Sequence, residues 1–299
     1  MISTVYIIII SHNGRKAVSR LLDSVYGSTY NDHSVILVDN NSKDGTTGIV
    51  KKHFPACDVI PSRVNCGYGA ACNIGIRKAI NDNAEFLLIL NQDTIIHEDM
   101  ILNLVKSAEG KPSAGVIGPK TYFLGPSISG SHRILYSGAW RRFLPLVQDV
   151  GDMGRLDEGQ CDRCARVDYV WGHGMFMRTS ALKRVGFFDP NFFMYYEDLD
   201  LCIRMQRAGY EIWYEPTAVM WHDIPDGARA SQSELWRWKH KSNSISLLHR
   251  KQYGRVPGFF LDMITMLIEV LALAKSGYVK AIEHRVLAWI MTTLKIENG

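Results

Sequence analysis

A run of apolar residues, Phe86–Leu90, stops abruptly at Asn91-Gln92-Asp93, and apolar residues then resume. The pattern reads as a buried strand that ends in two amides and an acid. A surface turn would explain this polarity, since Asn and Asp are common turn residues. A site for a metal ion and a charged ligand would explain it too, because hard cations such as Mg²⁺ prefer carboxylate oxygens.

Polar groups at the ends of several strands come together only if those strands form one sheet. The first 118 residues have the pattern of strands in one sheet. Apolar, β-rich runs alternate there with segments of helical spacing. Strands are expected over 4–11, 34–42, 57–62, 85–90 and 114–119, and helices over 14–28, 46–54, 69–82 and 98–109. This alternation is typical of an α/β fold, with a mostly parallel sheet covered by helices on both faces.

The carboxyl ends of the expected strands are the places where such a sheet binds ligands. Four of these ends are polar, small or acidic: Ser11-His12-Asn13, Asp39-Asn40-Asn41, residues 65–69 and Asn91-Gln92-Asp93. Each alone would suit a turn or a helix cap. Four in one half of a domain favour a binding site.

Beyond residue 118 the periodicity weakens until about residue 166, and long irregular segments of this kind are often functional loops or lids. Strand and helix patterns return from residue 167, and after Pro225 the chain becomes helical, apolar and basic. We therefore predict an α/β domain over 1–225, with halves 1–118 and 119–225, and a C-terminal helical region over 226–299.

The bulk properties exclude several classes of protein. The formal net charge is +4, from 34 Lys and Arg against 30 Asp and Glu, too small a surplus to indicate nucleic acid binding. The sequence has neither a signal peptide pattern nor a stretch apolar enough to span a membrane, so we expect a cytoplasmic protein. Its six cysteines are then expected to be reduced, and Cys161-x-x-Cys164 lacks the further ligands of a zinc site.

Four motifs follow one another along the chain: ILVDNNSKDGT, NCGYGAACNIGI, LILNQDT and GFFDPNFFMYYEDLDLCIRMQRAGYEIWYEPTAVMWH. Together they resemble the family 2 inverting glycosyltransferases of the GT-A fold, particularly the bacterial rhamnosyltransferase-like branch, over about residues 3–225. The resemblance implies a nucleotide-sugar-binding half over 1–118 and an acceptor-binding, catalytic half over 119–225. It also implies metal-dependent transfer of a sugar, L-rhamnose from dTDP-rhamnose being one candidate, to a hydroxyl of a cell-surface or polyprenyl-linked glycan.

On the matching positions, Asp93 is the expected ligand of Mg²⁺ or Mn²⁺, which would stabilise the charge of the departing diphosphate. Gln92 stands where this branch often has proline. His222 matches a histidine that completes the metal site, although a lone histidine after a strand can equally be structural. The resemblance implies that the nucleotide sugar is bound by Ser11, Asn13, Asp39, Asn65, Gly67, Asn73 and Gln92.

Four positions in these motifs bear on how the nucleotide sugar is bound. Asp39 matches the acid that accepts the N3–H of a pyrimidine base, although it would also suit a turn or a helix cap. Gly67 is expected where a side chain would collide with the donor. Asn73 is expected to begin a helix whose N–H groups favour an anion. Cys72 stands where relatives commonly have Arg or Asn, which leaves the choice between a dTDP-sugar and a UDP-sugar open.

Glu197 and Asp198 match the acidic pair of the family, whose second member takes the proton of the acceptor hydroxyl, so Asp198 is the expected base. The alternative is that these acids only begin a helix, where the helix dipole favours them. Trp171, Gly172 and His173 are expected to line the acceptor site, with the ring of Trp171 against a sugar, unless Trp171 is simply a core residue.

Residues 231–299 combine tryptophans and basic residues with an apolar stretch that carries Asp262 and Glu269. The two acids argue against a membrane span. Three interpretations stay open: a helical surface that contacts the inner face of the plasma membrane, a cap on the catalytic domain, and a homodimer interface.

Two other functions compete with glycosyl transfer. A sugar-nucleotide nucleotidyltransferase shares the α/β layout, but SHNGRKA is a poor match to the glycine-rich, basic loop expected of such an enzyme. A non-catalytic sugar-binding protein would not require Asp93, Asp198 and His222 together.

Overall fold

A computed structural model describes residues 4–125, 132–142, 147–149, 151–223 and 234–275, with eight further residues between 282 and 292. The chain forms two compact units. The first consists of Met1–Asp189 and Asp198–Ile224, and the second of Pro190–Glu197 and Pro225–Gly299. The short segment Pro190–Glu197 therefore groups with the C-terminal helices, although it lies inside the range predicted for the first domain.

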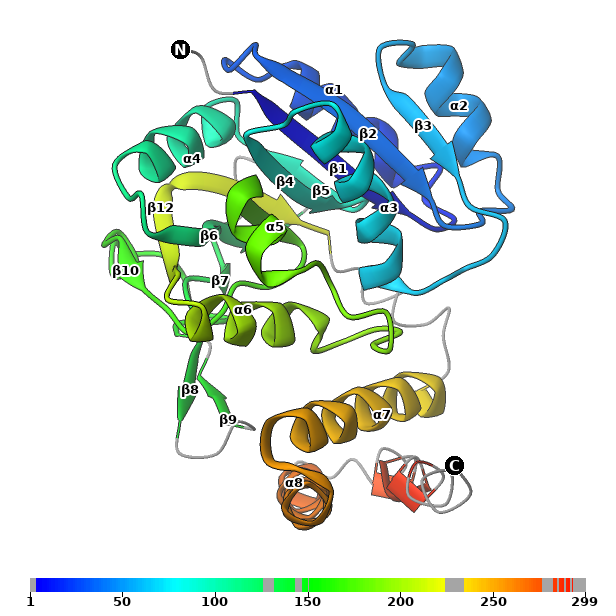
Figure 1. The fold of residues 1–299 in the computed structure, drawn as a ribbon, viewed down its shortest axis with the longest axis vertical. Helices are drawn as coiled ribbons and strands as arrows, with labels where there is room; N and C mark the ends of the chain where they lie inside the picture. The colour runs from blue at the N-terminus through cyan, green and yellow to red at the C-terminus, as the bar shows by residue number, and fades with distance from the viewer. Residues whose placement is uncertain are drawn as a thin grey trace. The chain divides into compact units, whose positions relative to one another are not determined.

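The first unit alternates strands and helices as the sequence predicts (Figure 1). Its first part contains β1 (Val5–Ser11), α1 (Ala17–Tyr26), β2 (His33–Asp39), α2 (Thr46–His53), β3 (Asp58–Pro61), α3 (Tyr68–Asn81), β4 (Phe86–Asn91), β5 (Thr94–Ile96), α4 (Met100–Glu109) and β6 (Ala114–Phe123). All the strands and helices expected up to residue 119 are present. The short strand β5 is an addition that the sequence did not indicate.

The remaining elements of this unit are shorter. They are β7 (Ile134–Tyr136), β8 (Trp140–Arg142), β9 (Val147–Asp149), β10 (Ala165–Arg166), β11 (Gly174–Arg178), α5 (Thr179–Val185), α6 (Glu197–Arg207) and β12 (Glu211–His222). Helix α6 begins with the last residue of the second unit, Glu197. The second unit also contains α7 (Glu234–Tyr253) and α8 (Arg255–Lys275).

The sheet has the strand order β10-β12-β6-β11-β4-β1-β2-β3. Strands β3, β2, β1 and β4 are parallel to one another, β12 is parallel to β6, and β11 runs antiparallel between β4 and β6. The prediction of a mostly parallel, mixed sheet is confirmed. The chain proceeds outward from β1 to β2 and β3, then returns to place β4 on the other side of β1, which creates the crevice where ligands bind in such sheets.

Helices cover both faces of this sheet because alternate strand residues point to opposite sides. Ile7 of β1 belongs to a buried cluster with Leu21 of α1 and Leu104 of α4. Ile8 instead faces α3, where a Cβ added to Gly75 would lie 2.5 Å from the Ile8 side chain. Helix α3 can therefore approach β1 closely only with glycine at that position.

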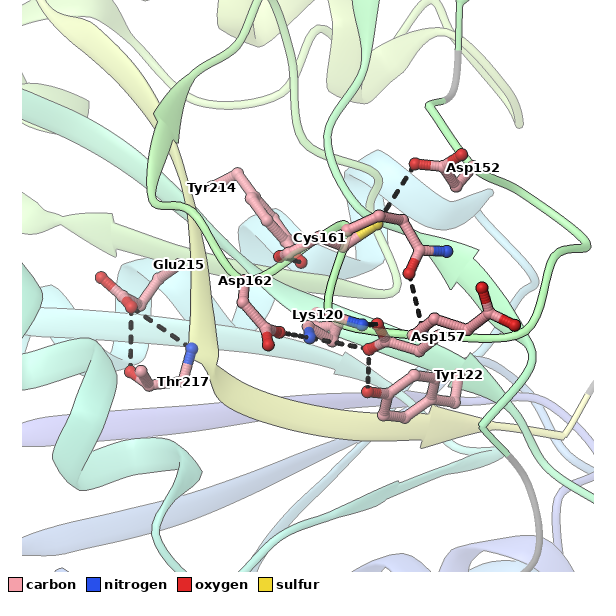
Figure 2. Close-up of polar contacts among 12 residues, drawn as sticks. Lys120, Tyr122, Asp152, Asp157, Cys161, Asp162, Tyr214, Glu215 and Thr217 are labelled. Atoms are coloured by element: carbon pink, nitrogen blue, oxygen red, sulfur yellow. Dashed lines mark hydrogen bonds and ion pairs between the residues drawn. The ribbon is translucent and has the colours of Figure 1, made fainter.

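Part of the predicted irregular region after residue 118 is fastened to the sheet (Figure 2). The ammonium group of Lys120, buried on β6, lies 2.8 Å from Asp157 Oδ2 and is also paired with Asp162. The hydroxyl of Tyr122 donates to Asp157. Although burial alone would raise the pKa of Asp157, hydrogen bonds from Lys120 and Tyr122 hold it below its usual range. These ion pairs fix the segment between 157 and 162, while residues 126–131 of the predicted loop lie outside the described residues.

Candidate active site

The carboxyl ends of β1 and β4 meet at the crevice, where Ile10 pairs with Asn91. The side chain of Gln92 joins the two ends: its Oε1 accepts hydrogen bonds from Ser11 Oγ at 2.7 Å and from the backbone N–H of His12 at 2.9 Å. A Cβ added to Gly14 would lie 2.0 Å from that oxygen, so a larger residue there would displace the Gln92 side chain from these hydrogen bonds. The middle residue of the polar tripeptide at the end of β4 thus fixes the shape of the edge.

The second polar strand end, after β2, is built around Asp39. Its carboxylate accepts hydrogen bonds from Ser42 N at 3.2 Å and from Thr47 Oγ1 at 2.8 Å. Asn13 lies across this turn with a left-handed φ of 54°, and its Oδ1 accepts from Lys43 N at 2.8 Å. Asp39 and Asn13 therefore belong to one edge of the crevice, as expected for residues of one binding site.

The loop before α3 is positioned by Asn40, a residue whose role the sequence did not reveal. Asn40 Nδ2 donates to Asn65 Oδ1 at 3.0 Å and to the carbonyl of Gly67 at 3.2 Å, and its Oδ1 accepts from Cys66 N at 3.0 Å. Gly67 has a φ of 87°, which favours glycine at this turn. The predicted loop of Asn65 and Gly67 is thus held beside the end of β2.

Asn73 does not begin its helix. Helix α3 starts at Tyr68, so the prediction that Asn73 is at the helix N-terminus is wrong. The buried amide of Asn73 instead donates to the carbonyl of Phe188 at 2.8 Å and accepts from the backbone N–H of Phe188 at 3.1 Å. The helix expected over 69–82 therefore begins close to where its pattern predicts, and only the placement of Asn73 at its start is wrong.

Asp93 and His222 lie side by side, although 129 residues separate them in the chain. The antiparallel pairing of β5 with β12 sets His222 opposite Thr94, directly after Asp93. His222 Nε2 is 3.0 Å from Asp93 Oδ1, and the Asp93 side chain is 31% exposed. The structure therefore places the predicted metal ligands together at the end of β4.

The spacing of this pair is that of a hydrogen bond, and it also matches two neighbouring ligands of a small divalent cation. Mg²⁺ has octahedral ligands at 2.0–2.1 Å, which places neighbouring ligand atoms about 3.0 Å apart, and the Asp93 and His222 atoms are separated by 3.0 Å. Within the described part of the chain, no third His, Cys, Asp or Glu joins a group that could hold a metal ion. A cation here would take its other ligands from phosphate or water, as Mg²⁺ commonly does.

His173 lies next to the metal pair. Its ring centroid is 4.9 Å from that of His222, and its Nε2 is 2.9 Å from Thr121 Oγ1. Burial, together with the neighbouring His222, lowers the pKa of His173 well below its ordinary value. His173 is therefore neutral at physiological pH and does not add a positive charge that would repel a bound cation.

Asp198 lies in the first turn of α6, opposite Gly172, the residue that precedes His173. The backbone N–H of Gly172 donates to Asp198 Oδ2 at 2.9 Å, and the Tyr68 hydroxyl donates to the carbonyl of Gly172 at 2.6 Å. Burial raises the pKa of Asp198 even though the N–H groups of Gly172 and Leu199 favour its charged form. The arrangement provides an oriented carboxylate of raised basicity, which suits a general base.

The residues on either side of Asp198 are buried, paired or strained. Glu197 is buried. Asp200 is 2.8 Å from Arg204 Nε and forms an i,i+4 ion pair with it on α6. Just before Glu197, Tyr195 and Tyr196 have left-handed φ angles of 71° and 64°, a strained conformation for aromatic residues. Two successive strained residues next to an acidic pair are a feature common at functional sites.

Trp171 has aromatic neighbours of its own. Its ring centroid is 5.6 Å from that of Tyr136 and 5.7 Å from that of His173, and its Nε1 donates weakly to Tyr169 at 3.4 Å. The side chain is only partly buried. Trp171 therefore belongs to one aromatic cluster with Tyr136 and His173, with part of its surface accessible.

Comparison with known proteins places these residues in a family context. The model of glycosyl transferase family 2 matches residues 6–186. The chain is 29% identical over 259 residues to rhamnosyltransferase WbbL of Escherichia coli K12, covering 83% of this chain and 94% of the relative. It is 28% identical over 258 residues to the N-acetylglucosaminyl-diphospho-decaprenol L-rhamnosyltransferase of Mycobacterium tuberculosis, covering 82% and 84% respectively.

Two solved structures are similar in fold. The mannosyltransferase PcManGT of Pyrobaculum calidifontis, in complex with GDP-Man and Mn²⁺, has a TM-score of 0.61 at 17% identity, covering 97% of this chain and 86% of that one. Staphylococcus aureus TarS 1–349, in complex with UDP-GlcNAc, has a TM-score of 0.59 at 16% identity, covering 95% and 79%. At these identities the likeness concerns the fold, and it confirms the predicted GT-A arrangement.

Proposed function

Since the chain belongs to the family 2 glycosyltransferases and is thus an enzyme of sugar transfer, we propose that it moves L-rhamnose from dTDP-rhamnose to a hydroxyl of a lipid-linked glycan, with a divalent cation at Asp93 and His222. The names of the two relatives support rhamnose as the sugar. The decaprenol diphosphate in the name of the mycobacterial relative supports a polyprenyl-linked acceptor. Such an acceptor would place the reaction at the inner face of the plasma membrane.

The observation that carries this proposal is the pairing of Asp93 with His222 at the crevice of the sheet. The Asp93 carboxylate suits Mg²⁺ or Mn²⁺, while the imidazole of His222 is a ligand more typical of transition metals and so favours Mn²⁺ of the two. When bound, the cation would offset the negative charge of the departing diphosphate. The complex of PcManGT with GDP-Man and Mn²⁺ supports such a metal on this fold.

Asp198 is proposed to take the proton of the attacking acceptor hydroxyl. The N–H of Gly172 orients its carboxylate, and burial makes this carboxylate a stronger base than an ordinary Asp. In a single displacement the hydroxyl oxygen forms a bond to the anomeric carbon, the bond from that carbon to the diphosphate oxygen breaks, and the proton remains on Asp198. The product sugar has the inverted configuration.

The nucleotide is proposed to lie along the ends of β1 and β2. Asp39 and the loop of Asn65 and Gly67 are the groups available to contact it. The side-chain amides of Gln92 and Asn73 are already hydrogen-bonded to protein groups. These two residues are therefore proposed to act through the shape of the crevice.

A transfer assay tests the proposal. Purified protein is incubated with Mn²⁺, with dTDP-rhamnose or UDP-GlcNAc, and with a polyprenyl diphosphate that carries N-acetylglucosamine. We expect the acceptor mass to increase by one rhamnose only with dTDP-rhamnose, and not in excess EDTA. Transfer of N-acetylglucosamine instead would overturn the donor assignment, and undiminished transfer in EDTA would overturn the metal assignment.

A further inference from the structure

Helix α8 of the second unit has its apolar side facing outward. Its apolar residues recur every three or four positions and so share one face of the helix. Their exposed fractions range from 40% to 68%, and they are Val256, Phe259, Phe260, Met263, Ile264, Leu267, Ile268 and Leu271. In a water-soluble helix this stripe would normally be packed against the core.

The opposite side of α8 is polar and buried, which fixes the orientation of the helix. Asp262 is 6% exposed and Thr265 is 5% exposed. The carboxylate of Asp262 accepts a hydrogen bond from Ser246 and contacts His249 Nδ1, and both partners lie on α7. Turning α8 to bury its apolar stripe would break these contacts and leave α7 with unpaired buried polar groups, which is costly.

The two helices that form this part of the second unit have a surplus of basic residues. The two helices, α7 and α8, contain seven Lys and Arg against three Asp and Glu. Two of the acids are used internally, Asp262 with His249 and Glu269 with Lys241 at 3.1 Å. The other acid is Glu234, so the surplus charge of the two helices is basic, and it includes the exposed Arg255 at the start of α8, next to Val256 of the stripe.

We propose that the stripe of α8 inserts into the interfacial layer of an anionic lipid bilayer, with the helix lying parallel to the membrane plane. An apolar face beside basic residues fits this partner, because acyl chains bury the first and anionic headgroups attract the second. A second copy of the chain fits less well, since its basic residues would approach those of the first copy. None of the described helices is long and apolar enough to cross a membrane.

This inference goes beyond the proposed function because it rests on the second unit alone and does not depend on which sugar is transferred. The membrane contact would determine where the chain meets its acceptor. A surface bound to the bilayer through α8 would keep the chain at the headgroup layer, where a polyprenyl-linked acceptor has its diphosphate and sugar.

A flotation experiment with the full chain tests the proposal. The protein is mixed with vesicles of phosphatidylcholine alone, or of phosphatidylcholine with phosphatidylglycerol, and the bound fraction is measured. Phe260→Glu/Leu267→Glu replaces two side chains of the stripe that are 53% and 55% exposed. We expect it to reduce binding to anionic vesicles at least about tenfold, because two apolar groups no longer enter the acyl layer.

The matched control is Lys183→Glu on α5, an exposed position of the first unit. It changes the net charge by the same two units as the double variant but leaves the stripe intact. We expect it to bind vesicles like the unchanged protein. Circular dichroism and donor hydrolysis confirm that each variant is folded and functional.

Three outcomes would overturn the proposal. Failure of the unchanged protein to float with anionic vesicles would do so directly. Equal loss of binding in the control would show that net charge alone is responsible. A stable dimer in the unchanged protein that becomes monomeric in the double variant, without vesicle binding, would show that the stripe binds a second copy. None of these results depends on rhamnose transfer, so failure of this inference is distinct from failure of the proposed function.

Discussion

Asp93 and Asp198 are two acids of one crevice with different surroundings. Asp93 is 31% exposed and faces the imidazole of His222 at 3.0 Å. Asp198 has its pKa raised by burial, and its carboxylate accepts hydrogen bonds from the backbone N–H groups of Gly172 and Leu199. The surroundings of Asp93 suit the binding of a cation, and those of Asp198 suit the uptake of a proton. The same side chain is thus directed to two kinds of chemistry by what surrounds it.

Removing Asp93 should have the largest effect. Asp93→Ala deletes the carboxylate proposed to hold the cation, so transfer should fall by at least about 10³-fold, since metal stabilisation of the transition state is worth several kcal/mol. The measurement is initial rate against Mn²⁺ concentration. Asp23→Asn, an exposed acid on α1, is the control and should leave the rate unchanged. A rate within tenfold of the unchanged protein would remove the metal role from Asp93.

Replacing Asp198 should have the next largest effect. Asp198→Asn keeps the shape of the side chain and removes its basicity, so kcat should fall by roughly 10²- to 10⁴-fold. Glu197→Gln is the matched variant and should lower kcat less, if Glu197 only positions its neighbour. Single-turnover transfer measures both. Should Glu197→Gln prove the inactive protein and Asp198→Asn the active one, the assignment within the pair would be reversed.

The pH dependence sharpens the difference between the two acids. A base must be deprotonated to act, so activity should fall as pH decreases through the pKa of Asp198. Because burial raises that pKa, the acidic limb should lie above the ordinary Asp value of about 3.9. The test is kcat as a function of pH at saturating Mn²⁺. An acidic limb at or below the ordinary Asp value would contradict the raised pKa.

The smallest effect is expected at Tyr68. Tyr68→Phe removes the hydroxyl that donates to the carbonyl of Gly172, the residue whose N–H orients Asp198. One such hydrogen bond contributes about 0.5–1.5 kcal/mol, so kcat should fall by roughly 2- to 10-fold. Donor affinity should hardly change. A loss of more than 100-fold would mean that Tyr68 itself contacts a substrate.

The sequence was sufficient for the strands and helices of the first half because their signals are local. Runs such as Phe86–Leu90 are apolar throughout, and α1 buries Val18, Leu21, Leu22 and Val25 at helical spacing. Strand β5 was missed because three residues carry no periodicity. The antiparallel placement of β11 between β4 and β6 was also out of reach, since pairing partners depend on the whole sheet.

The candidate site was predictable in its acids and less so in its supports. Resemblance to a family brought Asp93 and His222 together, whereas their spacing in the chain could not. The role of Asn40 depends on the conformation of a loop 25 to 27 residues away, which no local pattern encodes. The left-handed Tyr195 and Tyr196 were equally hidden, because nothing in their residue type favours that conformation.

The most direct test of the two roles is a calorimetric titration of dTDP-rhamnose into both variants, with and without Mn²⁺. If Asp93 holds the cation and Asp198 holds the proton, Asp93→Ala should lose the Mn²⁺-dependent part of donor binding. Asp198→Asn should then bind donor in Mn²⁺ as the unchanged protein does, despite its slow transfer. Mn²⁺-dependent donor binding that is intact in Asp93→Ala, or lost in Asp198→Asn, would contradict this division of roles.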